Sequence, residues 1–252
     1  TPAAGVEAVK ELRGKDKAAN GDLYNGMVHP LTRYTIRGAI WYQGEGNVGD
    51  GEIYTHRMNA LVTGWRKAWG QGEFPFYYTQ LTPLNWGGKP KDQHAELWEA
   101  QLAALAIPNT GMAVTTDIAG NVGEAHPKNK QEVGRRLALW ARAKTYGEKD
   151  LVYSGPLFQS AKLDGNKVRV AFDHAAGGLK SRDGKPLTWF LVAGADGKFV
   201  PAKAEIDGET VLVWADEVKA PAEVRLGGHQ IAEPNLVNAH GLPASPFRAA
   251  VK

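Results

Sequence analysis

Residues 36–47 read IRGAIWYQGEGN, an apolar run of branched and aromatic residues that ends in a polar loop spaced by glycines. The apolar part predicts a buried β-strand, and the loop then places Gln43, Glu45 and Asn47 at the end of that strand. Clustered amide and carboxylate groups beside a core must all be paired, which makes such a junction costly to build. Since α/β proteins bind ligands at strand ends of this kind, the loop is a candidate functional site.

The same order of strand and then helix recurs three times between residues 36 and 147. The spacing of apolar residues predicts strands at 36–42, 76–81 and 112–116, and helices at 54–69, at 93–106 and from just after Pro127 to Gly147. Asp92 suits the N-cap of the second helix, Pro127 the first turn of the third helix and Gly147 its C-terminal cap. Strands that alternate with helices predict an α/β fold whose parallel sheet is covered on both faces in three layers.

Beyond residue 147 the pattern changes to short strands separated by turns. We expect strands at 167–172, 188–193, 210–214 and 223–226, with Asp-Gly turns between or beside them. This pattern predicts a smaller antiparallel β domain. The expected organisation is therefore an entry segment or linker at 1–30, an α/β domain at 31–150, a β-rich accessory domain at 151–234 and a tail at 235–252 that lies over the surface.

Composition narrows the classes of function. The 252 residues include 30 basic and 27 acidic side chains, for a net charge of +3, and the charges are dispersed, so neither nucleic-acid nor membrane-surface binding is supported. No apolar run approaches the roughly 20 residues of a membrane helix. The absence of cysteine excludes disulfides, thiolate metal ligands and cysteine nucleophiles. The chain begins without Met or a signal peptide, as expected of a mature or truncated product.

Each of the three predicted strands runs into a polar loop, and in a parallel sheet these loops share one edge. The third loop, residues 117–127, carries Asp117, Glu124 and His126 on a glycine-rich segment just before a helix. A histidine beside a carboxylate is the pair of base and orienting group that acyl-transfer enzymes use. The loops are therefore expected to converge on one catalytic crevice.

Each of these residues also has a plain structural interpretation. His126 could cap its helix, Asp117 could form a turn, and Glu45 could pair with an arginine. Their joint placement at strand ends favours the functional interpretation. No pair of histidines has the spacing of a metal site, so neither a metal nor another cofactor is expected.

Four blocks of this sequence resemble those of the sialate O-acetylesterase family, which are carbohydrate esterases of the SGNH-hydrolase type. Residues 40–47 (IWYQGEGN) are similar to the family's Trp-Tyr-Gln-Gly-Glu-Ser-Asn block, with Gly46 in place of the serine. The other blocks are 23–27 with 30–31, 115–118 followed by 126–137 (HPKNKQEVGRRL), and 241–248 (GLPASPFR). The resemblance runs from about residue 23 to residue 248, nearly the whole chain.

The resemblance implies a serine esterase that removes O-acetyl groups from sialic acid or another acetylated sugar, in a periplasmic or extracellular location. By this resemblance His126 is the base, and the loop that carries Gln43, Gly44, Glu45 and Asn47 lines the substrate or oxyanion site. Two carboxylates, Glu124 and Asp117, remain candidates for orienting the histidine.

The family's nucleophile block, of the Gly-Gln-Ser-Asn type, is absent. The four serines, at 154, 160, 181 and 245, all fall outside the strand–helix units, and none sits on a nucleophile turn. The serine is therefore expected on a missing N-terminal part of the enzyme or on a partner chain, and this chain alone should be inactive. The missing part is also expected to add strands along the open edge of the sheet.

Two other functions remain open from the sequence. The chain could be a non-catalytic protein that binds glycans through Trp86, Trp98 and neighbouring loops. It could also be a glycoside hydrolase that uses Glu45 with Asp117 or Glu124, because paired carboxylates permit that chemistry. The second alternative has no role for the His-Pro block.

Overall fold

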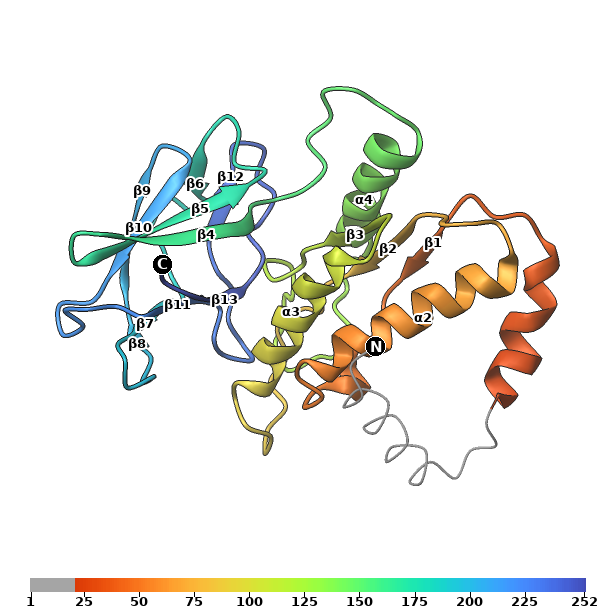
Figure 1. Ribbon diagram of the computed structural model, residues 1–252, viewed down its shortest axis with the longest axis horizontal. Helices are drawn as coiled ribbons and strands as arrows, with labels where there is room; N and C mark the ends of the chain where they lie inside the picture. Colours follow the sequence, from red (N-terminus) through yellow and green to blue (C-terminus); the bar gives the residue numbers. More distant parts are fainter. Residues whose placement is uncertain (1–20) are drawn as a thin grey trace.

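The computed structural model describes residues 21–252, so most of the expected segment 1–30 lies outside the described residues. A π-helical turn, η1 (Tyr24–Val28), and a 3₁₀ turn, η2 (His29–Arg33), come first. A parallel sheet follows, with β1 (Ala39–Trp41), β2 (Phe76–Thr79) and β3 (Thr110–Ala113) in that spatial order. Helices α2 (Ile53–Trp69) and α3 (Gln93–Ala103) cover one face, and α4 (Lys130–Trp140) covers the other (Figure 1). The predicted parallel three-layer arrangement is confirmed.

Strand β2 forms the centre of this part of the molecule, because all four of its residues are buried. Phe76 and Tyr78 point to the core under α2 and α3, whereas Tyr77 packs with Trp140 of α4. Burial of each of these aromatic side chains contributes roughly 1.5–3 kcal/mol to the stability of the fold. The alternation of the two faces along one strand therefore holds both helical layers to the sheet.

Strand β1 differs from the prediction of a buried strand. It lies at the edge of the sheet, and Ile40 is 69% exposed while Ala39 and Trp41 pack towards the core. The cause is the position of α4, which packs against β2 and β3 and leaves the matching face of β1 uncovered by the described residues.

The boundaries of several elements also shift, and β1 and β2 are shorter than the strands predicted at 36–42 and 76–81. Strand β3 ends at Ala113, not at residue 116, and Pro127 precedes α4 without forming its first turn. Asn129 is the N-cap instead, and its side-chain oxygen accepts a hydrogen bond from Glu132 N at 3.1 Å. Helical structure continues as a π-helical segment, η5 (Ala141–Thr145), and Gly147 then takes a positive φ of 72°. Asp92 precedes α3 as expected but does not cap it with its side chain.

The remaining residues form antiparallel sheets, as predicted. One four-stranded sheet has the spatial order β4 (Leu157–Asp164), β5 (Lys167–Asp173), β10 (Thr210–Trp214) and β9 (Lys203–Asp207). A second four-stranded sheet has the order β13 (Phe247–Ala250), β11 (Glu223–Leu226), β7 (Phe190–Ala193) and β8 (Val200–Pro201). A two-stranded sheet pairs β12 (Leu236–Asn238) with β6 (Leu179–Ser181). The two larger sheets share one core of valine and phenylalanine side chains.

The expectation that residues 235–252 lie over the surface is wrong. This segment supplies β12 and β13, and β13 pairs with β11 in register from Leu226 opposite Phe247. Asn238, Ser245 and Phe247 are all at most 1% exposed. The proline and glycine residues between the two strands hide their alternating pattern, and the pairing partner lies in a distant part of the chain.

Helix α3 lies between the parallel sheet and the β-rich part (Figure 1). Trp98 of α3 and Ala232 from the loop after β11 are both fully buried in one small cluster. Glu99, one residue further along α3, pairs with Arg225 of β11 at 2.6 Å. The two parts of the chain are therefore joined through this helix.

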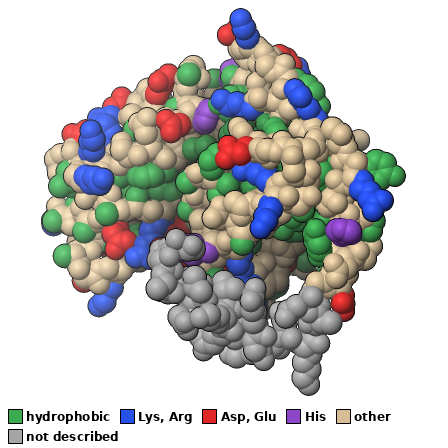
Figure 2. Space-filling model, turned by 45° about the vertical axis from the view of Figure 1, so that its right-hand side comes forward, with side chains coloured by type: hydrophobic (Ala, Val, Ile, Leu, Met, Phe, Trp, Pro, Cys, Tyr) green, Lys and Arg blue, Asp and Glu red, His purple; other side chains and the backbone are tan. Residues whose placement is uncertain are grey.

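Charged side chains of both signs are spread over the face of the molecule that Figure 2 displays, without a large patch of one sign. Among residues 21–252, no helix is long and apolar enough to cross a membrane.

We expect Gly155→Ala to destabilise the fold by about 2 kcal/mol, because a Cβ there would overlap the carbonyl group of Pro243. A backbone carbonyl cannot turn aside as a flexible side chain can. Gly134→Ala is the matched control: it lies in α4 with open space around its Cβ position, and it should stabilise the protein by up to about 1 kcal/mol. Urea unfolding of both variants tests the pair, and equal effects of the two substitutions would contradict the argument.

Candidate functional site

The loops that follow β1, β2 and β3 are joined at the carboxyl edge of the sheet. Asn85 N, in the second loop, donates a hydrogen bond to Val122 O of the third loop at 2.6 Å. Lys89 Nζ of the second loop reaches Val48 O of the first at 3.3 Å. Lys130, at the start of α4, lies 4.4 Å above the ring of Tyr42. The three loops therefore form one continuous surface.

The first loop is organised by its own polar side chains. Gly44 N donates to Glu45 Oε2 at 3.1 Å, and Gln43 Nε2 donates to Asn47 Oδ1 at 3.3 Å. Gly44 is buried with a φ of 155°, and a Cβ there would lie 3.2 Å from the side chain of Leu81, so glycine is required. Gln43 is exposed, whereas Glu45 and Asn47 are half-buried. Glu45 therefore closes its own loop, and no arginine pairs with it among the described residues.

A buried tyrosine on α2 donates a hydrogen bond to the backbone of this loop. The hydroxyl of Tyr54, on α2, donates to Gln43 O at 3.3 Å. Burial raises the pKa of Tyr54 to about 12, with a smaller contribution from the charges of Glu45 and Asp50. The hydroxyl therefore stays protonated at neutral pH and remains a donor that holds the Gln43 backbone.

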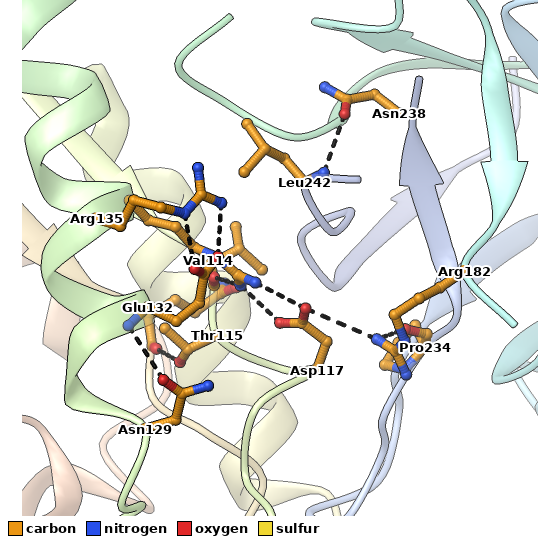
Figure 3. Close-up of polar contacts among 12 residues, drawn as sticks. Val114, Thr115, Asp117, Asn129, Glu132, Arg135, Arg182, Pro234, Asn238 and Leu242 are labelled. Carbon is orange, nitrogen blue, oxygen red and sulfur yellow. Dashed lines mark hydrogen bonds and ion pairs between the residues drawn. The ribbon is translucent and has the colours of Figure 1, made fainter. Parts of the chain in front are cut away.

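Asp117 forms a buried ion pair (Figure 3). Both its carboxylate oxygens accept from Arg136 of α4, at 2.6 and 2.8 Å, and Arg182 of the β-rich part lies 3.9 Å away. Arg136 also donates to Val114 O at 2.6 Å and to Glu132 at 2.7 Å. Burial lowers the pKa of Arg136, but its two carboxylate partners outweigh that effect and raise it. Asp117 thus joins the third loop to α4.

Glu124 and His126 lie further along the same loop and are both exposed. Asn121 shapes the turn before them, since its Oδ1 accepts from Gly123 N at 2.9 Å and its backbone oxygen from Glu124 N at 3.1 Å. Within residues 21–252, the side chain of His126 makes no hydrogen bond, to Glu124, Asp117 or any other group. The catalytic roles assigned to these residues stay predictions.

The sequence did not point to Gln230, which lies in the β-rich part and is 3% exposed. Its backbone oxygen accepts from Leu84 N at 2.9 Å and its backbone N donates to Lys91 O at 2.7 Å. Its side chain accepts from Trp86 N at 3.4 Å and donates to Asn85 Oδ1 at 3.2 Å. All the polar groups of Gln230 thus hold the second loop, but a lone glutamine between turn residues carries no sequence signal.

The second loop is also held by a buried histidine. Trp86 Nε1 donates to His94 Nδ1 at 2.8 Å, and His94 packs edge-on against Trp98 with ring centroids 4.7 Å apart. Trp98 is fully buried and donates to Leu81 O at 2.7 Å, so the expectation that Trp98 binds a glycan is wrong. Trp86 is only half-buried.

Ser245 and Asp117 are both engaged in structural contacts. Ser245 is fully buried and bonds Gln80 at 3.0 Å, and none of the four serines has a described hydrogen bond to a histidine. The glycoside-hydrolase alternative requires free carboxylates, whereas Asp117 is engaged by Arg136. In the part of the chain that the structure describes, no three His, Asp or Glu side chains come together as a metal site.

Comparison with known proteins gives one consistent family. A family model described as carbohydrate esterase, sialic acid-specific acetylesterase, matches residues 3–142. Sialate O-acetylesterase from Rattus norvegicus is 36% identical over 163 residues, and the alignment spans 58% of this chain and 30% of the rat protein. The human sialate O-acetylesterase is 35% identical over 162 residues, which are 58% of this chain and 31% of that protein.

A solved carbohydrate acetylesterase from Xanthomonas citri has a similar fold, with a TM-score of 0.84 and 43% sequence identity. The match covers 90% of this chain and 53% of the solved one. This chain therefore spans about half of the solved relative and less than a third of the rat enzyme.

We expect Asp117→Asn to destabilise the protein by about 3 kcal/mol, because it leaves the buried charge of Arg136 with one carboxylate partner fewer. The measurement is chemical unfolding at pH 7. Glu148→Gln, which breaks an exposed pair with Arg142, is the control and should leave the unfolding midpoint almost unchanged. An equal response of the two variants would show that the Asp117 pair is not a structural element.

Stability should fall in acid because of His94. Burial lowers the pKa of His94 to about 4, below its ordinary 6.5. Between these two pH values His94 is protonated in the unfolded chain but neutral in the folded chain. The contribution of neutral His94 is complete above pH 6.5 and is lost as pH falls towards 4, to a total of about 3 kcal/mol.

Urea unfolding between pH 7 and pH 4 tests this dependence. His94→Gln should flatten it, whereas His56→Gln, at an exposed position on α2, should keep it. An unchanged acid dependence in His94→Gln would contradict the assignment.

Proposed function

This chain belongs to the sialic acid-specific acetylesterase family of carbohydrate esterases, and we propose that it is the histidine-bearing part of an enzyme that hydrolyses O-acetyl esters of a sugar. The observation that carries the proposal is the position of His126. It lies exposed on a loop that is tied, through Val122 and Asn85, to the carboxyl edge of the parallel sheet. A base in that place can be reached by a substrate and by a nucleophile from outside the described residues.

In the proposed reaction a serine hydroxyl attacks the acetyl carbonyl while His126 takes its proton. The imidazolium then protonates the sugar oxygen as its bond to the acetyl carbon breaks, so that the sugar leaves with a free hydroxyl. A water that gives its proton to His126 attacks the acyl-enzyme, which releases acetate, and the serine takes the proton back. This sequence needs one nitrogen of the His126 imidazole available to the serine, and the exposed position of His126 leaves its ring accessible.

Glu124 is the better candidate for orienting His126. Both oxygens of Asp117 already accept from Arg136, and moving that carboxylate would leave the buried guanidinium with Glu132 as its one remaining described carboxylate partner. Glu124 is exposed and lies two residues before His126, and no arginine or lysine pairs with it among the described residues. We therefore assign Asp117 a structural role and Glu124 the orienting role.

The first loop would form the wall of the site that binds the oxyanion or the sugar. Gln43 is exposed, and its amide is held by Asn47. Tyr54 and Gly44 fix the backbone beneath it. A donor whose position is fixed before the reaction stabilises developing negative charge without reorganisation.

The serine would come from a polypeptide segment that pairs with the free edge of β1. Ile40 exposes 69% of its surface at that edge, and the solved relative is nearly twice as long as the matched region. An added strand would satisfy the edge of the sheet, and a helix connected to that strand would cover Ile40 on the face. The acetylated sugar as substrate, and a periplasmic or extracellular location, are parts of the same proposal.

We expect His126→Ala, in the complete enzyme that includes the serine-bearing part, to reduce acetate release from an aryl acetate by at least about 10³-fold, the scale of a general base with its nucleophile. Glu124→Gln should lower kcat more than Asp117→Glu does. His56→Ala, at an exposed position on α2, is the control and should retain full activity. Near-normal activity of His126→Ala would rule out the assignment.

A further inference from the structure

Trp189 has an unusual backbone conformation. It is one of four non-glycine residues in 21–252 with a positive φ, here 67°, the others being Asn109, Asp150 and His174. Asparagine and aspartate adopt this conformation at little cost, whereas a residue with a large side chain pays roughly 1–2 kcal/mol. Trp189 is 37% exposed, so part of its large side chain remains in contact with solvent.

The strained conformation is held by the residues on either side. Asn235 Oδ1 accepts hydrogen bonds from both Thr188 N and Thr188 Oγ1, at 3.0 and 3.2 Å. The carbonyl oxygen of Trp189 accepts from Gly227 N at 3.0 Å, and Phe190 is buried in the β core. Asn235 is itself 2% exposed. Trp189 is therefore fixed in place, with its ring partly in solvent.

The ring of Trp189 is stacked on His229, with ring centroids 6.0 Å apart and an angle of 27° between the planes. His229 is half-buried, and its Nδ1 accepts from Ile231 N at 3.3 Å, which fixes the imidazole ring. Burial lowers the pKa of His229 and the nearby Lys91 lowers it further, so the imidazole is neutral at pH 7. We name this pair, Trp189 with His229, the aromatic platform.

The aromatic platform lies next to the loops of the proposed site. His229 directly precedes Gln230, whose four polar groups hold the second loop through Leu84, Asn85, Trp86 and Lys91. The second loop is in turn bonded to the loop that carries His126. A ligand bound at His126 would have to extend over the second loop to contact this platform.

We propose that the aromatic platform binds a sugar ring of the acetylated glycan, outside the position of the acetyl group. The apolar C–H face of a sugar packs on an aromatic face, and a fixed ring binds it without losing further conformational freedom. A protein partner fits less well, since a stable protein interface needs about 800 Å² per partner and an exposed aromatic residue offers at most about 250 Å². This inference rests on the proposed esterase function.

Trp189→Gly tests the inference, because glycine keeps the positive φ and removes the ring. The complete enzyme is assayed with an aryl acetate and with two O-acetylated oligosaccharides, a sialyllactose and a xylo-oligosaccharide. For the oligosaccharide that the unmodified enzyme prefers, KM should rise about tenfold, the effect expected for one lost aromatic stack. With the aryl acetate, kcat/KM should change less than about twofold, and the melting temperature should change little, because relief of the positive-φ strain offsets the lost packing of the ring.

Three further variants distinguish loss of the platform from a general effect on the enzyme. Tyr146→Ala removes an aromatic residue that is 68% exposed elsewhere, and it should leave both assays unchanged. His229→Phe should retain the oligosaccharide KM because it keeps an aromatic ring, whereas His229→Ala should raise it.

The platform is overturned if Trp189→Gly matches the unmodified enzyme on the oligosaccharide, or if it loses activity on both substrates together with stability. If the unmodified enzyme does not hydrolyse the aryl acetate, the proposed function fails. Binding of the two oligosaccharides, measured by calorimetry, then decides the platform separately. Equal affinity of Trp189→Gly and the unmodified chain, or no binding by either, overturns it.

Discussion

The buried guanidinium of Arg136 connects most of the parts that build the proposed site. It binds Asp117 of the third loop, Glu132 of its own helix and the carbonyl oxygen of Val114 just after β3. A buried charge must keep its partners, because an unpaired one costs several kcal/mol. The helix, the strand end and the loop are therefore constrained together, and the loop that carries His126 starts from a fixed point.

The β-rich part contributes to the same edge and is more than an appended domain. Gln230 holds the second loop with both its backbone and its side chain, and Arg182 approaches Asp117 at 3.9 Å. Helix α3 lies between the two parts and buries Trp98. A substitution in the β-rich part can therefore change the geometry of loops that belong to the parallel sheet.

The exposed side chain of β1 is consistent with the finding that this chain covers 53% of the solved relative. Among residues 21–252 no strand pairs with the outer edge of β1, and Ile40 is exposed on the face that α4 does not cover, while both helical layers are packed. Edge strands with exposed apolar side chains are a liability unless they are covered. This constraint and the missing nucleophile lead to the same proposal, in which another segment supplies both a strand and a serine.

The parallel sheet and its helices could be predicted because their signals are local. Residues 54–69 carry helical apolar spacing, and β2 is a short run of aromatic residues, so each pattern lies within one element. The exposure of β1 could not be predicted in this way, since an apolar run looks the same whether α4 covers it or not. The start of α4 was missed because Pro127 and Asn129 both suit a helix start, and the side chain of Asn129 makes the bond.

For the site, the sequence by itself determined which residues stand at the strand ends, the family to which they point and the position of all four serines beyond residue 150. Only the tertiary structure decided what those residues do. It engaged Asp117 with Arg136, left Glu124 and His126 exposed, buried Trp98 and brought Gln230 and the segment 235–252 into the core. The physical reason is the distance along the chain over which each property is set. Residue type and spacing are properties of a short stretch of sequence, whereas charge pairing and burial depend on contacts between segments that are far apart in the chain.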